Sequence, residues 1–215
     1  MVAAACHFLS HKGVFITIQL LANLKLDKFI YGLIVVCAVA ATAYCTWALD
    51  RGFDITDESY YLLLAKYADS QTLYISAQHW VTNWIWQAGG GSIVMFRAAG
   101  LLILTLSSTL LAFGTLTVCT PTGILEDNIR SKSLVTAGSI ICALLYASTI
   151  NLSPCYNLLA SAGAYAATGL VLYASQQLKS IASNILYFLA GSAIGVEVLC
   201  KASSGISTLI ILSIL

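Results

Sequence analysis

FIYGLIVVCAVAATAYCTWAL, residues 29–49, is a stretch without a charged side chain. A transmembrane helix needs about 20 consecutive apolar residues, so this stretch is long enough to cross a bilayer. It is followed closely by the acidic sequence FDITDESYY, which runs from Phe53 to Tyr61. The sequence therefore predicts a spanning helix with a carboxylate-rich loop directly at one of its ends.

The composition of the whole chain is that of an integral membrane protein. Hydrophobic residues make up 59% of the chain and charged residues 9%, and the mean hydropathy is +0.88. Backbone groups in hydrocarbon must be hydrogen-bonded internally, and no alternating strand pattern supports a barrel. We therefore expect an all-α fold, a multispanning transmembrane helix bundle.

Apolar stretches of about 17–25 residues predict about six spans. The last stretch is still hydrophobic at Leu215, which predicts that the chain is the front portion of a longer protein. Residues 29–215 are expected to form one transmembrane module, whose first span is an uncleaved signal anchor or, alternatively, a cleaved signal. The predicted spans lie near residues 29–49, 92–114, 134–150, 157–175, 184–200 and from 203 onward.

Basic residues set the predicted orientation. Lys12, Lys25 and Lys28 precede the first span, and the other basic loops fall on the same side if the spans alternate. By the positive-inside rule this is the cytoplasmic side of a cell membrane. Residues 1–28 are therefore expected to be cytoplasmic and the loop 50–91 external. The other basic residues on the cytoplasmic side are Arg130, Lys132 and Lys179.

The sequence supports neither nucleic-acid binding nor a metal site built from cysteines. The net charge is +1 and no basic stripe with interleaved aromatic residues is present, so we expect no nucleic acid partner. The seven cysteines show no CxxC or CxxH spacing, and they are interpreted as small buried hydrophobic residues. We assign no metal-ligating residue and leave a divalent ion open.

The acids of the external loop are the first candidate site. Asp54, Asp57 and Glu58 lie together at the outer end of the first span. A carboxylate placed there can act as a general base toward a hydroxyl or amine. Acids in the first turn of a helix also stabilise its N-terminus, so simple capping of a short helix over residues 57–68 is the alternative. That helix is expected to lie flat on the membrane, with Tyr60, Leu63, Leu64 and Tyr67 on one apolar face.

Charged residues inside predicted spans are the second candidate site. Glu197 and Lys201 are four residues apart, in the order that favours an intrahelical ion pair. Lys201 as a point charge and Arg97 as a planar fork could each hold a lipid phosphate. For both cations the alternative is that the side chain extends to the headgroups, with the Glu197–Lys201 pair neutralising itself at the membrane boundary.

Polar and aromatic side chains complete the predicted external face. His79 lies among Trp80, Trp84 and Trp86, a cluster typical of the headgroup level. Tyr156 and Asn157 open the fourth span, where their polar groups could bond sugar hydroxyls. Because they follow Pro154, a tight interhelical turn is the simpler interpretation of these residues.

The motifs taken in order resemble the GT-C superfamily of membrane glycosyltransferases. They are Asp-Glu-x-Tyr-Tyr after the first span, Phe-Arg at Phe96–Arg97, Tyr-Asn at Tyr156–Asn157 and the stretch Gly191–Lys201. The most similar branch is the protein O-mannosyltransferase and aminoarabinose transferase type, which includes bacterial transferases that modify lipopolysaccharide core sugars. The resemblance extends over nearly the whole chain from Lys28 onward, and family members continue into later spans.

The resemblance implies a donor sugar linked to a polyprenyl phosphate, a membrane lipid partner and an inverting transfer on the external face to a glycan, lipid or protein acceptor. It places the catalytic base at Asp57, its partner at Glu58 and a phosphate contact at Lys201. The leading hypothesis is therefore a membrane glycosyltransferase. The alternatives are a multispan transporter or flippase with Arg97, Glu197 and Lys201 along its path, and a membrane scaffold without chemistry.

Overall fold

The protein is a bundle of α-helices, seen in a computed structural model that describes residues 26–52, 57–70, 77–125, 127–149, 152–177 and 181–214. No strand occurs among these residues, so the predicted all-α fold is confirmed. The helices are α3 (Leu26–Ala48), α4 (Asp57–Lys66), η1 (Ala68–Ser70), α5 (Gln78–Ala88), α6 (Ile93–Cys119), α7 (Ile129–Thr149), α8 (Tyr156–Ser175), α9 (Ile181–Cys200) and α10 (Ala202–Ile214).

Five of these helices are long and apolar enough to cross a membrane. They are α3, α6, α7, α8 and α9, and each lies where the sequence predicted a span. The sixth predicted span corresponds to α10, which is apolar but has 13 residues in this structure. A helix of that length rises about 20 Å, which is less than the roughly 30 Å of a hydrocarbon core.

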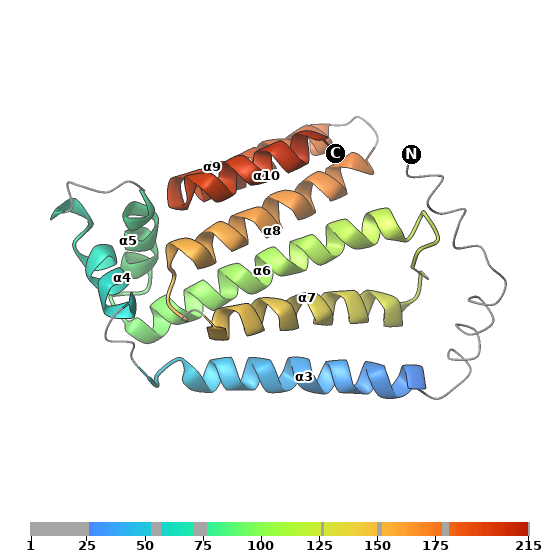
Figure 1. Cartoon of the computed structure of the whole chain (residues 1–215), viewed down its shortest axis with the longest axis horizontal. Helices are drawn as coiled ribbons and strands as arrows, with labels where there is room; N and C mark the ends of the chain where they lie inside the picture. Colours follow the sequence, from blue (N-terminus) through green and yellow to red (C-terminus); the bar gives the residue numbers. More distant parts are fainter. Residues whose placement is uncertain are drawn as a thin grey trace.

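The long helices lie side by side in a fixed order. Starting from α3, each packs on the next, through α7, α6 and α8 to the α9–α10 pair (Figure 1). Successive spans run in opposite directions, so the loop after α3, the turn before α8 and the junction between α9 and α10 meet at one end of the bundle. This shared end is the arrangement that the alternating topology predicted, and we call it the α4–α5 end.

Glycines allow the central helices to touch. A Cβ atom added to Gly169 on α8 would lie 2.4 Å from the backbone of Leu110 on α6. On the other face of α8, a Cβ at Gly163 would lie 2.9 Å from Cβ of Glu197. Backbones that approach so closely gain packing contacts over their whole length. Gly163 and Gly169 therefore allow α8 to pack closely on α9 and on α6.

Gly191 and Gly195 on α9 behave differently. A Cβ atom at either position would meet nothing within 4 Å. Glycines at this helical spacing are typical of close helix packing, but among the described residues these two make no such contact. The two glycines lie on the open side of α9.

The α4–α5 end is capped by two short helices. The predicted helix over residues 57–68 is found as α4 followed by the 3-10 turn η1, and α5 covers the predicted tryptophan cluster. A tight turn through Gly90 and Gly91, with φ of 63° and 72°, then leads into α6. Only glycine adopts such angles at low cost, which explains how the chain turns back into the bundle here.

The face that α4 packs on the bundle differs from the one predicted to be apolar. Leu62 and Ala65 are buried with Glu58, whereas Tyr60, Leu63 and Tyr67 are about half exposed. Of the four residues of the predicted apolar face, only Leu64 is buried. The membrane contact predicted for this exposed face stays a prediction.

Candidate functional site

Lys201 is held between two helices at the α4–α5 end. It is the residue between α9 and α10, and its Nζ donates a hydrogen bond of 2.9 Å to Oδ1 of Asn157 on α8. The same ammonium lies 5.5 Å from the centroid of the Tyr156 ring. The structure therefore brings Lys201, Tyr156 and Asn157 together, although they are far apart in the sequence.

Asp57 lies close to this group of residues. Its side chain is exposed in the first turn of α4, one helical turn before Tyr61. Burial raises the pKa of the Tyr61 phenol, and nearby Cys155, Tyr156 and Asp57 act in the same direction. Burial also raises the pKa of the Cys155 thiol, with a further contribution from the Asp57 carboxylate. Asp57 thus lies within electrostatic reach of the turn that opens α8.

Two tyrosine rings connect the acid to the cation. The Tyr61 and Tyr156 ring centroids are 6.1 Å apart, with the planes inclined at 58°. Aromatic pairs at this separation attract each other through the edge and face of their rings. Tyr61, Tyr156, Asn157 and Lys201 are thus linked by contacts, and Asp57 lies one turn before Tyr61 on α4; we call these five residues the Asp57–Lys201 cluster.

The turn before α8 explains how the cluster is positioned. Cys155 has extended backbone angles and caps α8 by accepting a contact of 3.5 Å from the Leu158 amide. Pro154 stops α8 from extending further back, and its ring fits against Gly100 of α6, where a Cβ atom would lie only 3.0 Å away. Tyr156 and Asn157 are consequently fixed in the first turn of α8, facing α4 and α9.

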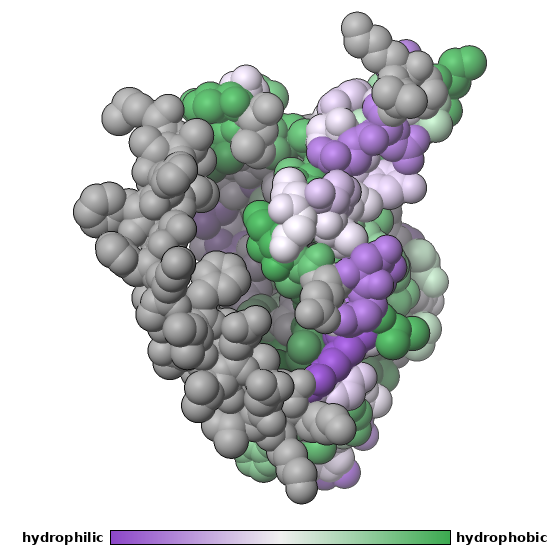
Figure 2. Space-filling model, turned by 90° about the vertical axis from the view of Figure 1, so that its right-hand side faces the viewer, coloured by the Kyte–Doolittle hydropathy of each residue, from purple (hydrophilic) through white to green (hydrophobic). Residues whose placement is uncertain are grey.

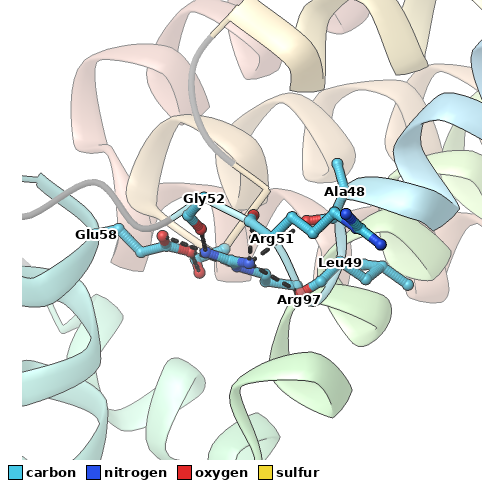
Figure 3. A network of polar contacts seen from close by, with 7 residues as sticks. Ala48, Leu49, Arg51, Gly52, Glu58 and Arg97 are labelled. Atoms are coloured by element: carbon cyan, nitrogen blue, oxygen red, sulfur yellow. Dashed lines mark hydrogen bonds and ion pairs between the residues drawn. The ribbon is translucent and has the colours of Figure 1, made fainter.

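Arg97 and Glu58 form a buried ion pair beside the cluster (Figure 3). Arg97 donates from Nε to Glu58 Oε1 at 2.7 Å and from a terminal nitrogen to Oε2 at 2.6 Å. Its remaining donors bond the carbonyls of Leu49, Arg51 and Gly52, at 2.8, 3.1 and 2.5 Å. All five N–H groups of the guanidinium are thereby used within the protein.

These contacts change the interpretation of two predicted site residues. Arg97 was expected to grip a phosphate, but it is 4% exposed and its donors bind the end of α3 and the start of α4. Glu58, expected to assist catalysis, is 3% exposed and also accepts from the Ser153 hydroxyl. In this structure the pair joins α4 to α6, and Arg97 also bonds the end of α3. The guanidinium that was expected to bind a phosphate therefore binds a carboxylate of the protein itself.

The predicted ion pair between Glu197 and Lys201 is not formed. Glu197 is fully buried, and its Oε1 accepts hydrogen bonds from Ser204 and Thr208 of α10 at 2.6 and 3.0 Å. Its Oε2 has no hydrogen-bond partner among the described residues. Lys201 points instead to Asn157, although its amide still donates to the Glu197 carbonyl at 2.7 Å as in a continuous helix.

The two remaining predicted site residues are His79 and Asp54. His79 is 6% exposed near the start of α5, with its ring 5.6 Å from that of Trp80. The start of α5 is tied to α9, since the Ala77 amide donates to the Leu199 carbonyl at 3.0 Å. Asp54 lies outside the described residues. Within the described ranges, no three His, Cys, Asp or Glu side chains gather as a metal site would require.

Three residues of this region were not singled out as candidates from the sequence. Tyr61 belongs to the DESYY motif, and its spacing of four from Asp57 could have identified it, because such residues share a helix face. Ser153 and Cys155 flank Pro154 and carry no signal of their own. Their role depends on the contact between α4 and the turn before α8, which only the fold reveals.

Comparisons with protein families, with curated proteins and with solved structures gave no match.

Proposed function

We propose that the protein is a membrane glycosyltransferase that uses a sugar linked to a lipid phosphate. The single observation that carries the proposal is the Asp57–Lys201 cluster, in which Lys201 lies beside Tyr156, Tyr156 lies beside Tyr61, and the exposed Asp57 precedes Tyr61 by one turn of α4. Both groups lie at the α4–α5 end of the helix bundle, since Asp57 opens α4 and Lys201 joins α9 to α10. This is the arrangement needed for chemistry on a substrate with a hydrocarbon tail.

The proposed reaction divides the work between the two charges. The Asp57 carboxylate takes the proton of an acceptor hydroxyl or amine while the acceptor atom forms a bond to the anomeric carbon of the sugar. The bond from that carbon to the lipid phosphate breaks, and its electron pair leaves with the phosphate. Lys201 stabilises the negative charge of the departing phosphate, which is where the charge develops during the reaction.

The remaining cluster residues orient these two groups. Asn157 accepts a hydrogen bond from Lys201, which fixes the direction of a long and otherwise flexible side chain. Tyr61 and Tyr156 form an aromatic wall against which a sugar ring can stack. The Arg97–Glu58 pair takes no part in the chemical step. It positions Asp57, because Glu58 is adjacent to Asp57 and anchors the first turn of α4 to α6.

The test is transfer by the full chain in vesicles, with a panel of sugars linked to polyprenyl phosphate as donors. We expect released polyprenyl phosphate and labelled acceptor from the wild type, and a loss of about 100-fold or more in kcat for Asp57→Asn. Asp69→Asn is the matched control, since Asp69 is an exposed acid in η1 at the same end. Wild-type turnover by Asp57→Asn would reject its role as the base.

A second candidate function is transport, which the position of Glu197 favours. An ionisable side chain that is fully buried between apolar helices is the usual mark of a substrate or ion path. The same vesicles distinguish the two functions. Uptake of the labelled lipid or sugar without formation of a new glycosidic bond, and sensitive to Glu197→Gln, would favour transport over transfer.

A further inference from the structure

A second feature of interest lies at the opposite end of the bundle from the Asp57–Lys201 cluster. An open cavity of about 1190 Å³ is lined by α3, by the C-terminal part of α6 and by the N-terminal part of α7. None of the cluster residues lines it. Its walls include Ala38, Thr42, Leu116, Thr117, Ala137 and Ile140.

The walls of the cavity are more apolar than their residue types suggest. The hydroxyl of Thr42 donates to the Ala38 carbonyl at 2.8 Å, that of Thr117 to Gly114 at 2.7 Å, and that of Ser133 to Ile129 at 2.7 Å. Each of these bonds returns to the residue's own helix. The donors are therefore used, and the side chains present mainly their carbon atoms to the cavity.

Charge is found at only one end of the cavity. Asp127 and Lys132 line it where α6 passes into α7, and they form an ion pair of 2.6 Å. Both side chains are more than half exposed, so this pair contributes little and can be exchanged for another partner. Lys132 has three N–H donors, of which the bond to Asp127 uses one. Figure 2, which views this end of the molecule, shows hydrophilic residues in a band beside apolar ones.

We propose that this cavity binds an acyl chain of an anionic phospholipid, with the lipid phosphate at Lys132. An apolar cavity inside a bilayer provides no hydrogen-bond partners for a polar ligand. A hydrocarbon chain, in contrast, fills it without leaving a polar group unpaired. The single polar end matches the single headgroup of a lipid. Arg130, whose guanidinium lies 5.6 Å from the Tyr31 ring, adds positive charge at the same membrane surface.

The position of α3 gives this lipid a structural role. Among the described helices α3 packs mainly on α7, and only 6% of its spanning window is buried. A chain bound between α3, α6 and α7 would fill the space that protein contacts leave open, and would hold α3 against the bundle. The site is separate from the donor site of the proposed transfer, since it lies at the other end of the spans.

The test compares two lipids with identical acyl chains, phosphatidylglycerol and phosphatidylcholine, added to the delipidated full chain in detergent. We expect a larger rise in Tm and more retained lipid in native mass spectra with phosphatidylglycerol. Ala137→Phe fills the cavity and should abolish both effects. Ala182→Phe is the matched control, because Ala182 is an exposed alanine of α9 that does not line the cavity.

Two surface substitutions keep the test decisive if Ala137→Phe fails to fold. Lys132→Ala should remove the preference for phosphatidylglycerol, and Asp127→Asn should increase it by freeing the ammonium. Equal stabilisation by both lipids in the wild type, or an unchanged preference in both surface variants, would overturn the proposal. A change of oligomeric state in Ala137→Phe would overturn it too, because a second copy of the chain would then occupy the cavity.

Discussion

Arg97 near the start of α6 and Glu58 in the first turn of α4 are joined by two parallel hydrogen bonds of 2.7 and 2.6 Å, both out of contact with solvent. The same guanidinium bonds three carbonyls that follow α3. One side chain therefore links the end of α3 to the first turn of α4, which contains the candidate base. The position of Asp57 depends on this contact, because it is the residue directly before Glu58.

Replacing Arg97 by lysine is expected to destabilise the protein strongly. An ammonium cannot make the two parallel bonds, and Glu58 would keep a buried and poorly paired charge. Removing one partner of such a pair typically costs about 3–5 kcal/mol. The free energy of unfolding in detergent measures the effect.

Arg51→Lys is the matched control for this substitution. Arg51 forms an exposed pair with Asp50 at 3.6 Å, and pairs of this kind contribute about 0–1 kcal/mol. A double-mutant cycle with Glu58→Gln would then give the coupling energy. Equal losses from Arg97→Lys and Arg51→Lys would show that the buried pair has no special role.

The contact between α6 and α8 predicts a large effect of a single methyl group. Gly169→Ala would place a Cβ atom 2.4 Å from the Leu110 backbone, so the two helices must move apart. Overpacking of this kind costs about 1–3 kcal/mol. Gly138→Ala is the control, because its Cβ atom would meet nothing within 4 Å and alanine favours the helix by about 1 kcal/mol. A lower Tm for Gly138→Ala than for Gly169→Ala would contradict this account.

Much of the fold could be predicted from the sequence because the spans are set by local composition. An apolar stretch such as Phe29–Leu49 is helical in a bilayer whatever its neighbours are, and the five long helices lie near their predicted positions. The partners of the charged side chains could not be predicted in the same way. Arg97 and Glu58 are 39 residues apart, and no local pattern reveals that they meet.

The spacing rule also failed where the helix was interrupted. Glu197 and Lys201 have the separation of an intrahelical ion pair, but at the break between α9 and α10 Lys201 bonds Asn157 and Glu197 accepts from α10. Nothing in the apolar sequence around Cys200 indicates that break. The cluster around Asp57 was predicted in part, since the shared end of Asp57, Tyr156 and Lys201 followed from alternating spans while the contacts through Tyr61 did not.

Tyr61 gives a prediction for the alkaline range. Burial raises its pKa in the folded protein, whereas an unfolded tyrosine loses its proton near pH 10. As the pH rises above about 10, the unfolded state releases this proton and the folded state keeps it, so the stability falls. Tyr61→Phe should reduce the loss of unfolding free energy between about pH 9 and pH 12. An identical pH dependence in both proteins would exclude a buried phenol at this position.

The alternating topology predicts which loops face the same side of a membrane. Ser70→Cys and Gln87→Cys lie at the α4–α5 end, and Thr122→Cys lies in the turn between α6 and α7. An impermeant maleimide should label the first two from one side and the third from the other, with the third on the cytoplasmic side. Native Cys37 is the internal control, since it is exposed within α3 and should react only after detergent is added. Labelling of all three positions from one side would contradict the topology.

Asn157 provides the most specific test of the Asp57–Lys201 cluster. Its amide oxygen accepts the hydrogen bond from Lys201, the residue proposed to bind the donor phosphate. Asn157→Asp keeps the shape of the side chain but adds a charge that would pair with Lys201 and compete with a phosphate. We expect a higher KM for the lipid-phosphate donor, because the added charge competes with its phosphate, and a lower kcat, because Lys201 is then less able to stabilise the departing phosphate. Asn184→Asp, an exposed substitution near the start of α9, should leave both constants unchanged. If Asn157→Asp changed neither constant, Lys201 would not contact the donor phosphate and the role assigned to this ammonium would be wrong.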